Sequence, residues 1–237
     1  MSNSTSWAVV LPAHNSADNI LETVEELSEY FQSNFLSGQV VIVENGSKDN
    51  TWEVMESINS AVLPFELIRV RSDKGLGNAI REGLTHVTTE FVLITADDLP
   101  FGFSDLDGYR STESSTDIAI GSKAHPQTDG NRSVSRELMS TVFRFLRRVI
   151  VGVNLGDTQG TILGNAKVIR DLSIHTRQPG YLMTTELLAR ATAISCSIVE
   201  LPVKYRRDQR KSNINVIDDS IKMLRGLFEV RRSLKSD

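Results

Sequence analysis

The chain has 237 residues, of which 40% are hydrophobic and 24% charged, and its formal net charge at pH 7 is −4. These values are ordinary for one or two globular domains and exclude the overall basic charge that is typical of nucleic-acid-binding proteins. A single cysteine, Cys196, excludes an internal disulfide. Because no apolar run approaches the ~20 residues that span a bilayer, and the polar start lacks the pattern of a secretion signal, we expect a cytoplasmic protein. The inner face of a membrane is the alternative location.

The first hundred residues alternate between strand and helix patterns. Short apolar runs predict strands, and apolar residues that recur every three or four positions predict helices between them. The predicted strands cover residues 7–11, 40–43, 67–70 and 91–95, and the predicted helices cover about 20–31, 52–58 and 76–87. Repeated strand–helix units with short connections predict an α/β fold with a mostly parallel sheet and helices on both faces.

The pattern is less regular beyond residue 110. We predict strands at 117–121 and 197–205, helices at 136–151, 182–193 and from about 216, and a mobile polar loop at 122–133. We interpret the charged last helix as solvated; in the alternative, Leu227 and Val230 would enter a lipid interface. No repeat or linker divides the chain, so a single domain over residues 1–237 is expected.

Two adjacent carboxylates, Asp97 and Asp98, follow the predicted strand at 91–95. In open α/β sheets, ligands bind at the carboxyl ends of the strands. Two carboxylates in one small volume repel each other unless a cation or a proton intervenes. A divalent metal that carries a diphosphate would satisfy both groups, whereas an acidic turn that caps the next helix is the alternative.

Three loops of the first half have unusual compositions. The small residues of 12–15 allow a planar group to approach the backbone, and the acidic and amide side chains of 44–51 suit a nucleobase or a ribose. Lys74 lies beside two glycines at a predicted helix start, which predicts a phosphate cradle because free backbone donors and the helix dipole point there. Each loop taken alone is also compatible with an ordinary turn.

Together these segments resemble the family-two glycosyltransferases, which have the GT-A fold. Residues 12–15 are similar to the Pro-Thr-Tyr-Asn loop of that family, and residues 44–51 to its Asp-Asp-Gly-Ser-x-Asp-x-Thr turn. Residues 75–79 are similar to its Gly-Leu-Gly-x-Ala helix start, and residues 96–98 to its Asp-x-Asp metal motif.

The second half resembles the polyprenyl-phosphate sugar transferases, the group of dolichyl-phosphate mannose and glucose synthases. Residues 117–123 are similar to the Asp-Ile-Val-x-Gly-Ser-Arg strand of that group, and residues 157–160 to its Asp-Thr-Gln element. Residues 180–187 are similar to its glutamate-bearing helix, and residues 200–203 to its Glu-Val-Pro-Ile strand. The basic segment 206–213 occupies the place of a basic loop in that group.

The resemblance covers about residues 7–230 and implies one GT-A domain. It implies a nucleotide-sugar-binding half at about 7–110 and an acceptor-side half with the C-terminal helix at about 111–237. The implied activity is that of a hexosyltransferase in cell-envelope glycan biosynthesis. Such an enzyme moves a sugar, with inversion, from a nucleoside diphosphate sugar to a polyprenyl phosphate or a sugar hydroxyl. The implied nucleotide-sugar-binding residues are Pro12, Ala13, Asn15, Glu44, Asn45, Gly46, Ser47, Asp49, Lys74, Gly75, Asp97, Lys123, Arg136 and Arg207.

The resemblance also assigns two catalytic residues. Asp98 is expected to hold Mg²⁺ or Mn²⁺ against the departing diphosphate, and Glu186 is expected to act as general base if the acceptor is a hydroxyl. Ala96 stands where the family motif has its first aspartate, so metal dependence stays open. The alternatives are a degenerate GT-A domain that binds nucleotide sugar without turnover and, less favoured, a nucleotidyltransferase.

Overall fold

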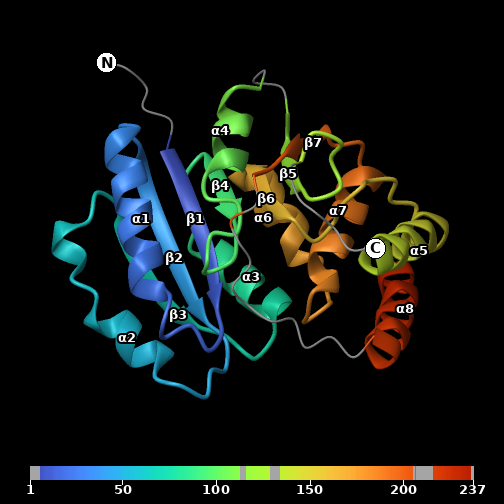
Figure 1. The fold of residues 1–237 in the computed structure, drawn as a ribbon, viewed down its shortest axis with the longest axis horizontal. Coiled ribbons are helices and arrows are strands. Elements are labelled where there is room, and N and C mark those ends of the chain that lie inside the picture. Colours follow the sequence, from blue (N-terminus) through green and yellow to red (C-terminus); the bar gives the residue numbers. More distant parts are fainter. Residues whose placement is uncertain (1–5, 113–115, 129–133, 205, 207–215, 236–237) are drawn as a thin grey trace.

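A seven-stranded sheet runs through the computed structural model, which describes residues 6–112, 116–128, 134–204, 206 and 216–235 (Figure 1). The strand order is β3-β2-β1-β4-β6-β5-β7. Within the described residues, β6 alone runs antiparallel to its neighbours, β4 and β5, so the predicted mostly parallel α/β sheet is confirmed. The strands are β1 (Ser6–Ala13), β2 (Ser37–Glu44), β3 (Glu66–Arg71), β4 (Phe91–Ile94), β5 (Ile118–Ser122), β6 (Thr161–Asn165) and β7 (Ile198–Pro202).

Helices cover both faces of the sheet (Figure 1). One face carries α1 (Ile20–Ser33), α2 (Thr51–Ser57) and α4 (Ser104–Arg110), with a short 3₁₀ turn at Ser60–Val62. The other face carries α3 (Leu76–Thr85), α6 (Ala166–Ile174) and α7 (Leu182–Ala193). The remaining pair, α5 (Val134–Val151) and α8 (Val216–Ser233), pack against each other at one end of the molecule.

The central strands are apolar at successive positions because both of their faces are buried. In β1, Ala8 and Val10 pack into the cluster under α3, while Val9 and Leu11 pack into the cluster under α1. All four side chains are fully buried. Successive side chains of a strand point to opposite faces, so a continuous apolar run is what a sheet covered on both sides requires.

The order in which strands are added to the sheet changes direction at β1. The chain adds β2 and β3 on one side of β1 and then returns to place β4 on the other side. Such a reversal leaves a crevice beyond the carboxyl ends of the two strands, where doubly wound folds bind their ligands. The ends of β1 and β4 therefore mark the expected site.

Three elements were not predicted from the sequence: α4, α6 and strand β6. The sequence of β6 (Thr161–Asn165) is short and includes Gly164, whose φ of +146° favours glycine. A Cβ atom at Gly164 would lie 2.2 Å from the carbonyl oxygen of Asp117. The strand therefore depends on close approach between backbones, which no hydrophobic periodicity reveals.

Two side chains of α8 that were considered for contact with lipid face the interior of the protein. Leu227 and Val230 are both fully buried, because they pack with α5 and α7 in the core clusters at this end of the molecule. The interpretation that these two side chains enter a lipid interface is therefore wrong. Among the described helices, none combines the length and the apolar character needed to cross a membrane.

Candidate active site

A cleft of about 530 Å³ opens at the carboxyl ends of β1 and β4. Its walls come from the end of β1, from the segments after β1, β2, β4 and β5, from the start of α3, from β6 and the residues just before it, and from the start of α7. Six residues predicted from the sequence line it: Pro12, Asn45, Lys74, Gly75, Asp97 and Lys123. Residues that line it without having been predicted as binding residues include His14, Thr95, Ala96, Phe101, Gln159, Thr161, Tyr181 and Thr184.

The structure places the two adjacent carboxylates, Asp97 predicted to bind the nucleotide sugar and Asp98 predicted to hold the metal, in different surroundings. Asp97 is 4% exposed and lines the cleft, whereas Asp98 is exposed and lies outside the cleft lining. The reason is local, because β4 ends at Ile94 and the chain then turns, with Leu99 at a φ of +42°. The two-residue alternation of a strand does not extend past that point. Among the described residues of the lining, Asp97 is the one carboxylate.

The loops after β1 and β2 are tied to each other by side chains. The backbone amide of Asn15 donates to Ser47 Oγ at 3.0 Å, and the Asn15 Oδ1 atom accepts from the Lys48 amide at 2.8 Å. Asp49 accepts hydrogen bonds from the Ala17 and Thr51 amides. The pKa of the Asp49 carboxyl is lowered: slight desolvation at this exposed position acts to raise it, but these hydrogen bonds, together with that from the Thr51 hydroxyl, outweigh the desolvation. The predicted binding residues Asn15, Ser47 and Asp49 thus stiffen the cleft rim from outside the lining.

Asn45 presents an unsatisfied acceptor at the cleft. Its backbone amide donates to the Ala13 carbonyl oxygen at 3.1 Å, which places Ala13 beneath the site with no exposed surface. The Asn45 side chain is 5% exposed, and its Oδ1 atom has no hydrogen-bond partner within the described part of the chain. Buried polar atoms rarely lack a partner, so this oxygen suits an N–H or O–H donor of a ligand.

Glu44 is held at the edge of the same wall. One of its carboxylate oxygens accepts from the Ser47 amide at 2.5 Å, across the turn at Gly46. The other oxygen lies 3.8 Å from Arg71 Nε. The Arg71 guanidinium in turn stacks 4.1 Å from the ring centroid of Trp52. Glu44 and Gly46 flank Asn45 in the chain but lie outside the cleft lining.

Two amides at the start of α3, where the sequence predicts a phosphate cradle, are bonded to a later segment of the chain. The amides of Gly77 and Asn78 donate to the Pro179 carbonyl oxygen at 2.8 and 3.3 Å. A helix start whose amides are already bonded has fewer donors to offer a phosphate. Glycine at position 75 lets the backbone near Pro179 come close to the start of α3, because a Cβ atom at Gly75 would lie 2.3 Å from the Pro179 carbonyl oxygen. Lys74 and Gly75 still line the cleft, so they contribute surface and, in Lys74, charge.

This close approach gives a stability prediction for Gly77→Ala. The new Cβ would lie 2.3 Å from the Gln178 carbonyl oxygen and 2.7 Å from Met183 Cβ. Overpacking of this kind outweighs the better helix propensity of alanine, so we expect the free energy of unfolding to fall by about 2 kcal/mol. Urea denaturation measures it, with Gly180→Ala as the control because a Cβ there meets no atom within 4 Å. Equal stability of the two variants would contradict the packing described.

Glu186 is buried away from the cleft with both of its carboxylate oxygens engaged. Its Oε2 atom accepts from the amides of Arg177 and Gln178 at 2.8 and 2.9 Å. Its Oε1 atom accepts from Arg190 at 3.2 Å and from the Ser233 hydroxyl at 2.7 Å. The carboxylate has no exposed surface and is absent from the cleft lining. This geometry corrects the prediction of a general base, because the groups around Glu186 make it an anchor for the 177–180 loop.

Next to the cleft lies a smaller pocket of about 240 Å³. Lys123 and Gln159 line both cavities, and the Lys123 amide donates to Asp157 Oδ2 at 3.1 Å. Arg147, which is 2% exposed, lines the smaller pocket, and its Nε atom has no partner within the described residues. Burial lowers the pKa of the Arg147 guanidinium, against the charges of Asp157 and Glu200, which raise it.

The structure describes no side chain for two of the predicted binding residues. Arg136 falls on α5, but its side chain is outside the described residues, and Arg207 is outside them altogether. Beneath the cleft, Asp105 accepts a hydrogen bond from the hydroxyl of Thr161, which lines the cleft. Burial raises the pKa of the Asp105 carboxyl, although the hydrogen bonds from Thr161 and from the Leu106 amide lower it.

The donor atoms at the cleft suit a divalent cation that is shared with a substrate. Within the part of the chain that the structure describes, no three acidic, histidine or cysteine side chains are grouped to hold a metal by themselves. Mg²⁺ is commonly bound by one or two carboxylates together with substrate phosphates and waters. Asp97 supplies one such carboxylate in the cleft lining.

The sequence of the chain is similar to a known protein family and to characterised enzymes. The model of the family described as "Glycosyl transferase family 2" matches residues 8–172. A dolichyl-phosphate beta-glucosyltransferase of Saccharomyces cerevisiae is 28% identical over 246 positions, covering 94% of this chain and 73% of the relative. Another dolichyl-phosphate beta-glucosyltransferase, from Trichomonas vaginalis, is 26% identical over 243 positions, covering 96% of this chain and 71% of the relative.

Solved structures share the fold at lower identity. Glucosyl-3-phosphoglycerate synthase from Mycobacterium tuberculosis, in complex with Mn²⁺, UDP-glucose and phosphoglyceric acid, superposes with a TM-score of 0.66 and 16% identity. The match covers 97% of this chain and 79% of that one. The same enzyme in complex with Mg²⁺ and UDP gives a TM-score of 0.65 at 17% identity, covering 95% and 78% of the two chains. At this identity the comparison supports the fold alone.

Proposed function

The chain belongs to glycosyl transferase family 2 and is a glycosyltransferase, and from that premise we propose that it transfers glucose from UDP-glucose to a polyprenyl phosphate, with inversion. The observation that carries this proposal is the cleft at the reversal of strand order, with one buried carboxylate and two lysines in its lining. The names of the relatives, dolichyl-phosphate beta-glucosyltransferases, support the choice of sugar and acceptor.

The nucleoside would lie along the walls after β1 and β2. Pro12 and His14 line this part of the cleft, and the Asn45 Oδ1 atom there lacks a partner within the described residues. A hydrogen bond from the base or the ribose would remove the cost of leaving that buried oxygen unsatisfied. The hydrogen bonds between the loop after β1 and the loop after β2 hold this wall in place before the donor binds.

The diphosphate would lie between the two lysines of the cleft. Lys74 comes from the segment before α3 and Lys123 directly follows β5, and both line the same cleft as Asp97, which lies in the turn after β4. When bound, Mg²⁺ or Mn²⁺ on Asp97 would supply Lewis-acid neutralisation of the leaving group. The lysines add fixed positive charge where negative charge develops as the diphosphate departs.

The acceptor would react as an anion. Asp97 is the one carboxylate among the described lining residues, so a hydroxyl acceptor finds no second carboxylate there to take its proton. A phosphate oxygen is already ionised at neutral pH and needs no base. It would attack the anomeric carbon from the face opposite the diphosphate, forming one carbon–oxygen bond as the other breaks, which inverts that carbon. The beta product in the names of the relatives agrees with this outcome for an α-linked donor.

The direct test is transfer of labelled glucose in solution. We expect the purified chain to move label from UDP-glucose to a short-chain polyprenyl phosphate, and not to the corresponding alcohol, in the presence of Mn²⁺. Nuclear magnetic resonance of the product measures the anomeric configuration, for which we expect the β form. Transfer to the alcohol at an equal rate would contradict the anionic acceptor, and the absence of transfer from any nucleotide sugar would overturn the proposed function.

A further inference from the structure

Side chains of α1 hold the segment that carries Asp97. This segment, residues 95–103, joins β4 to α4, and we call it the β4–α4 connection. Thr23, Glu26 and Tyr30 of α1 follow one another at helical spacing, so they lie along one side of the helix. Each of the three is attached to a different point of the connection, as the contacts below show. One helix therefore fixes the connection along its length.

Thr23 makes the contact nearest to the carboxylate. Its hydroxyl donates to the carbonyl oxygen of Asp97 at 2.5 Å, and both residues are 4% exposed. A threonine hydroxyl within a helix commonly bonds to a carbonyl oxygen of the preceding turn, whereas this one bonds to a residue 74 positions later in the chain. A buried carbonyl oxygen is unfavourable without a donor. The bond therefore favours the observed direction of the peptide group that follows Asp97.

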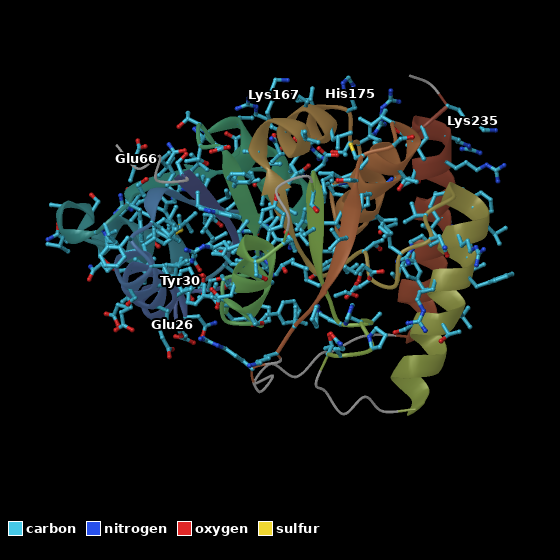
Figure 2. The ribbon with its side chains drawn as sticks, turned by 90° about the horizontal axis from the view of Figure 1, so that it is seen from above. Glu26, Tyr30, Glu66, Lys167, His175 and Lys235 are labelled. Atoms are coloured by element: carbon cyan, nitrogen blue, oxygen red, sulfur yellow. The ribbon has the colours of Figure 1, made fainter. Side chains whose placement is uncertain are left out.

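Glu26 and Tyr30 hold the later part of the connection. Arg206 donates from Nη1 to Glu26 Oε2 at 2.5 Å, and its backbone amide donates to the Pro100 carbonyl oxygen at 2.9 Å. The Tyr30 ring stacks on Phe103 with the ring centroids 4.0 Å apart. Figure 2 shows Glu26 and Tyr30 near each other on α1. The ion pair is partly exposed, where such pairs contribute little to stability, so the buried hydroxyl contact is the stronger of the polar ties.

The connection has a backbone conformation that its own sequence does not favour. Leu99 has a φ of +42°, in the left-handed region that is unfavourable for a residue with a Cβ atom. Its side chain is 1% exposed and packs in the same core cluster as Val24 and Leu27 of α1. Conformations of this kind persist only where the surrounding structure holds them. Here α1 supplies both the apolar packing for Leu99 and the hydrogen bond to Asp97.

We propose that Thr23 is a positioning residue, which holds the Asp97 backbone so that the Asp97 carboxylate, and not that of Asp98, lines the cleft. The backbone dihedral angles of a residue determine which side-chain rotamers it can adopt, so a fixed peptide group limits where the carboxylate can point. This inference rests on the proposed function for the role of Asp97 as a ligand of the cation. Groups that orient a metal-binding side chain typically contribute about 10- to 100-fold to metal affinity.

The test compares variants at two buried hydroxyls. Thr23→Val keeps the branched shape of the side chain and removes the hydroxyl, whereas Thr23→Ser keeps the hydroxyl. Thr176→Val is the matched control, because Thr176 is 5% exposed, donates to the Ser173 carbonyl oxygen at 2.7 Å and lies outside the cleft lining. Thermal unfolding checks that each variant folds. If valine is not tolerated at position 23, Thr23→Ala against Thr23→Ser repeats the comparison, since these two differ only in the hydroxyl.

Calorimetry of Mn²⁺ binding in the presence of saturating UDP is the first measurement. We expect Thr23→Val to lower the Mn²⁺ affinity by at least about tenfold. Thr23→Ser and Thr176→Val should each change it by less than about threefold. Wild-type Mn²⁺ affinity in Thr23→Val would overturn the proposal, and so would a loss of the same size in Thr23→Ser or Thr176→Val.

A double variant shows whether the effect passes through Asp97. Residues that act through one another have non-additive effects, so in an Asp97→Asn background Thr23→Val should lower the Mn²⁺ affinity by less than about twofold further. Electron paramagnetic resonance of free Mn²⁺ measures the weak binding expected there. An equal loss in both backgrounds would overturn the proposal. Wild-type Mn²⁺ affinity in Asp97→Asn would also overturn it, because Asp97 would then not be the ligand.

Hydrogen exchange of the ligand-free chain tests the same contact without any metal. The Leu99 amide donates to the Ala96 carbonyl oxygen at 3.2 Å, and the Gly102 amide donates to that of Leu99 at 2.8 Å. We expect Thr23→Val to speed amide exchange in residues 95–102 by about fivefold, with no such change in Thr176→Val. Wild-type exchange there in Thr23→Val would show that the hydroxyl does not hold the connection.

The proposed function and this inference can fail separately. If Mn²⁺ binding responds to Thr23 as described but no glucose is transferred to a polyprenyl phosphate, the proposed function fails and the positioning role stands. If glucose is transferred while Thr23→Val keeps the Mn²⁺ affinity of the wild type, the proposed function stands and the positioning role fails.

Discussion

Replacing Asp97 with asparagine is expected to lower kcat/KM for glucosyl transfer by at least about a hundredfold. Asp97 is the one carboxylate among the described residues of the cleft lining and is 4% exposed there. Asparagine keeps the size of the side chain but removes the negative charge, so the proposed cation would lose its ionic ligand from the protein. The rate should also lose most of its response to added Mn²⁺, which a titration of the metal measures.

Asp98→Asn is the matched control because it removes the same charge from the adjacent position. Asp98 is exposed and lies outside the cleft lining, so we expect a change in kcat/KM of less than about threefold. Thermal unfolding of both variants checks that each one folds. A larger loss from Asp98→Asn than from Asp97→Asn would contradict this account. It would instead support Asp98 as the metal ligand, as the resemblance to the family motif implies.

Replacing Glu186 with glutamine is expected to lower the free energy of unfolding by about 3 kcal/mol. The carboxylate is fully buried and accepts two backbone hydrogen bonds and two from Arg190 and Ser233. The substitution leaves the Arg190 guanidinium in the interior without its counter-charge and turns one acceptor into a donor. Urea denaturation at neutral pH measures the loss, and Ser233→Ala, which removes one hydroxyl of the same network, should cost only about 1 kcal/mol.

The pH profile of kcat separates this anchoring role from general-base catalysis. A catalytic base must lose its proton before it acts, so its removal would abolish the fall in rate at acidic pH. For an anchor, the folded fraction of Glu186→Gln should keep the shape of the wild-type profile, measured well below its unfolding temperature. A variant with wild-type stability but a flattened acidic limb would contradict the anchoring role.

Much of the fold followed from the sequence because the central strands are buried on both faces. Apolar runs such as 7–11 and 40–43 predicted β1 and β2 within a few residues of their ends. The strand β6 was missed because its pairing depends on glycines at Gly160 and Gly164, where neighbouring backbones come too close for a side chain. Backbone proximity of this kind leaves no hydrophobic period to detect.

The location of the site was predictable, whereas the direction of individual side chains was not. A strand that ends in two carboxylates indicated the right edge of the sheet, but which of the two enters the cleft depends on the turn after Ile94. The glycines and the lysine at the start of α3 predicted a phosphate cradle. The local sequence does not reveal that two amides of this helix donate hydrogen bonds to the Pro179 carbonyl oxygen, about a hundred positions later in the chain. Contacts between distant segments decide such cases.

In the proposed function, the cleft holds a nucleoside diphosphate against Asp97. A crystal structure of the chain with UDP and Mn²⁺ tests it most directly, because the ion and its ligands are visible in the same map. We predict that the ion contacts the Asp97 carboxylate and the diphosphate, with the base on the side of Asn45 and the phosphates toward Lys74 and Lys123. An ion bound to Asp98 with no contact to Asp97, or a nucleotide bound outside this cleft, would contradict the account.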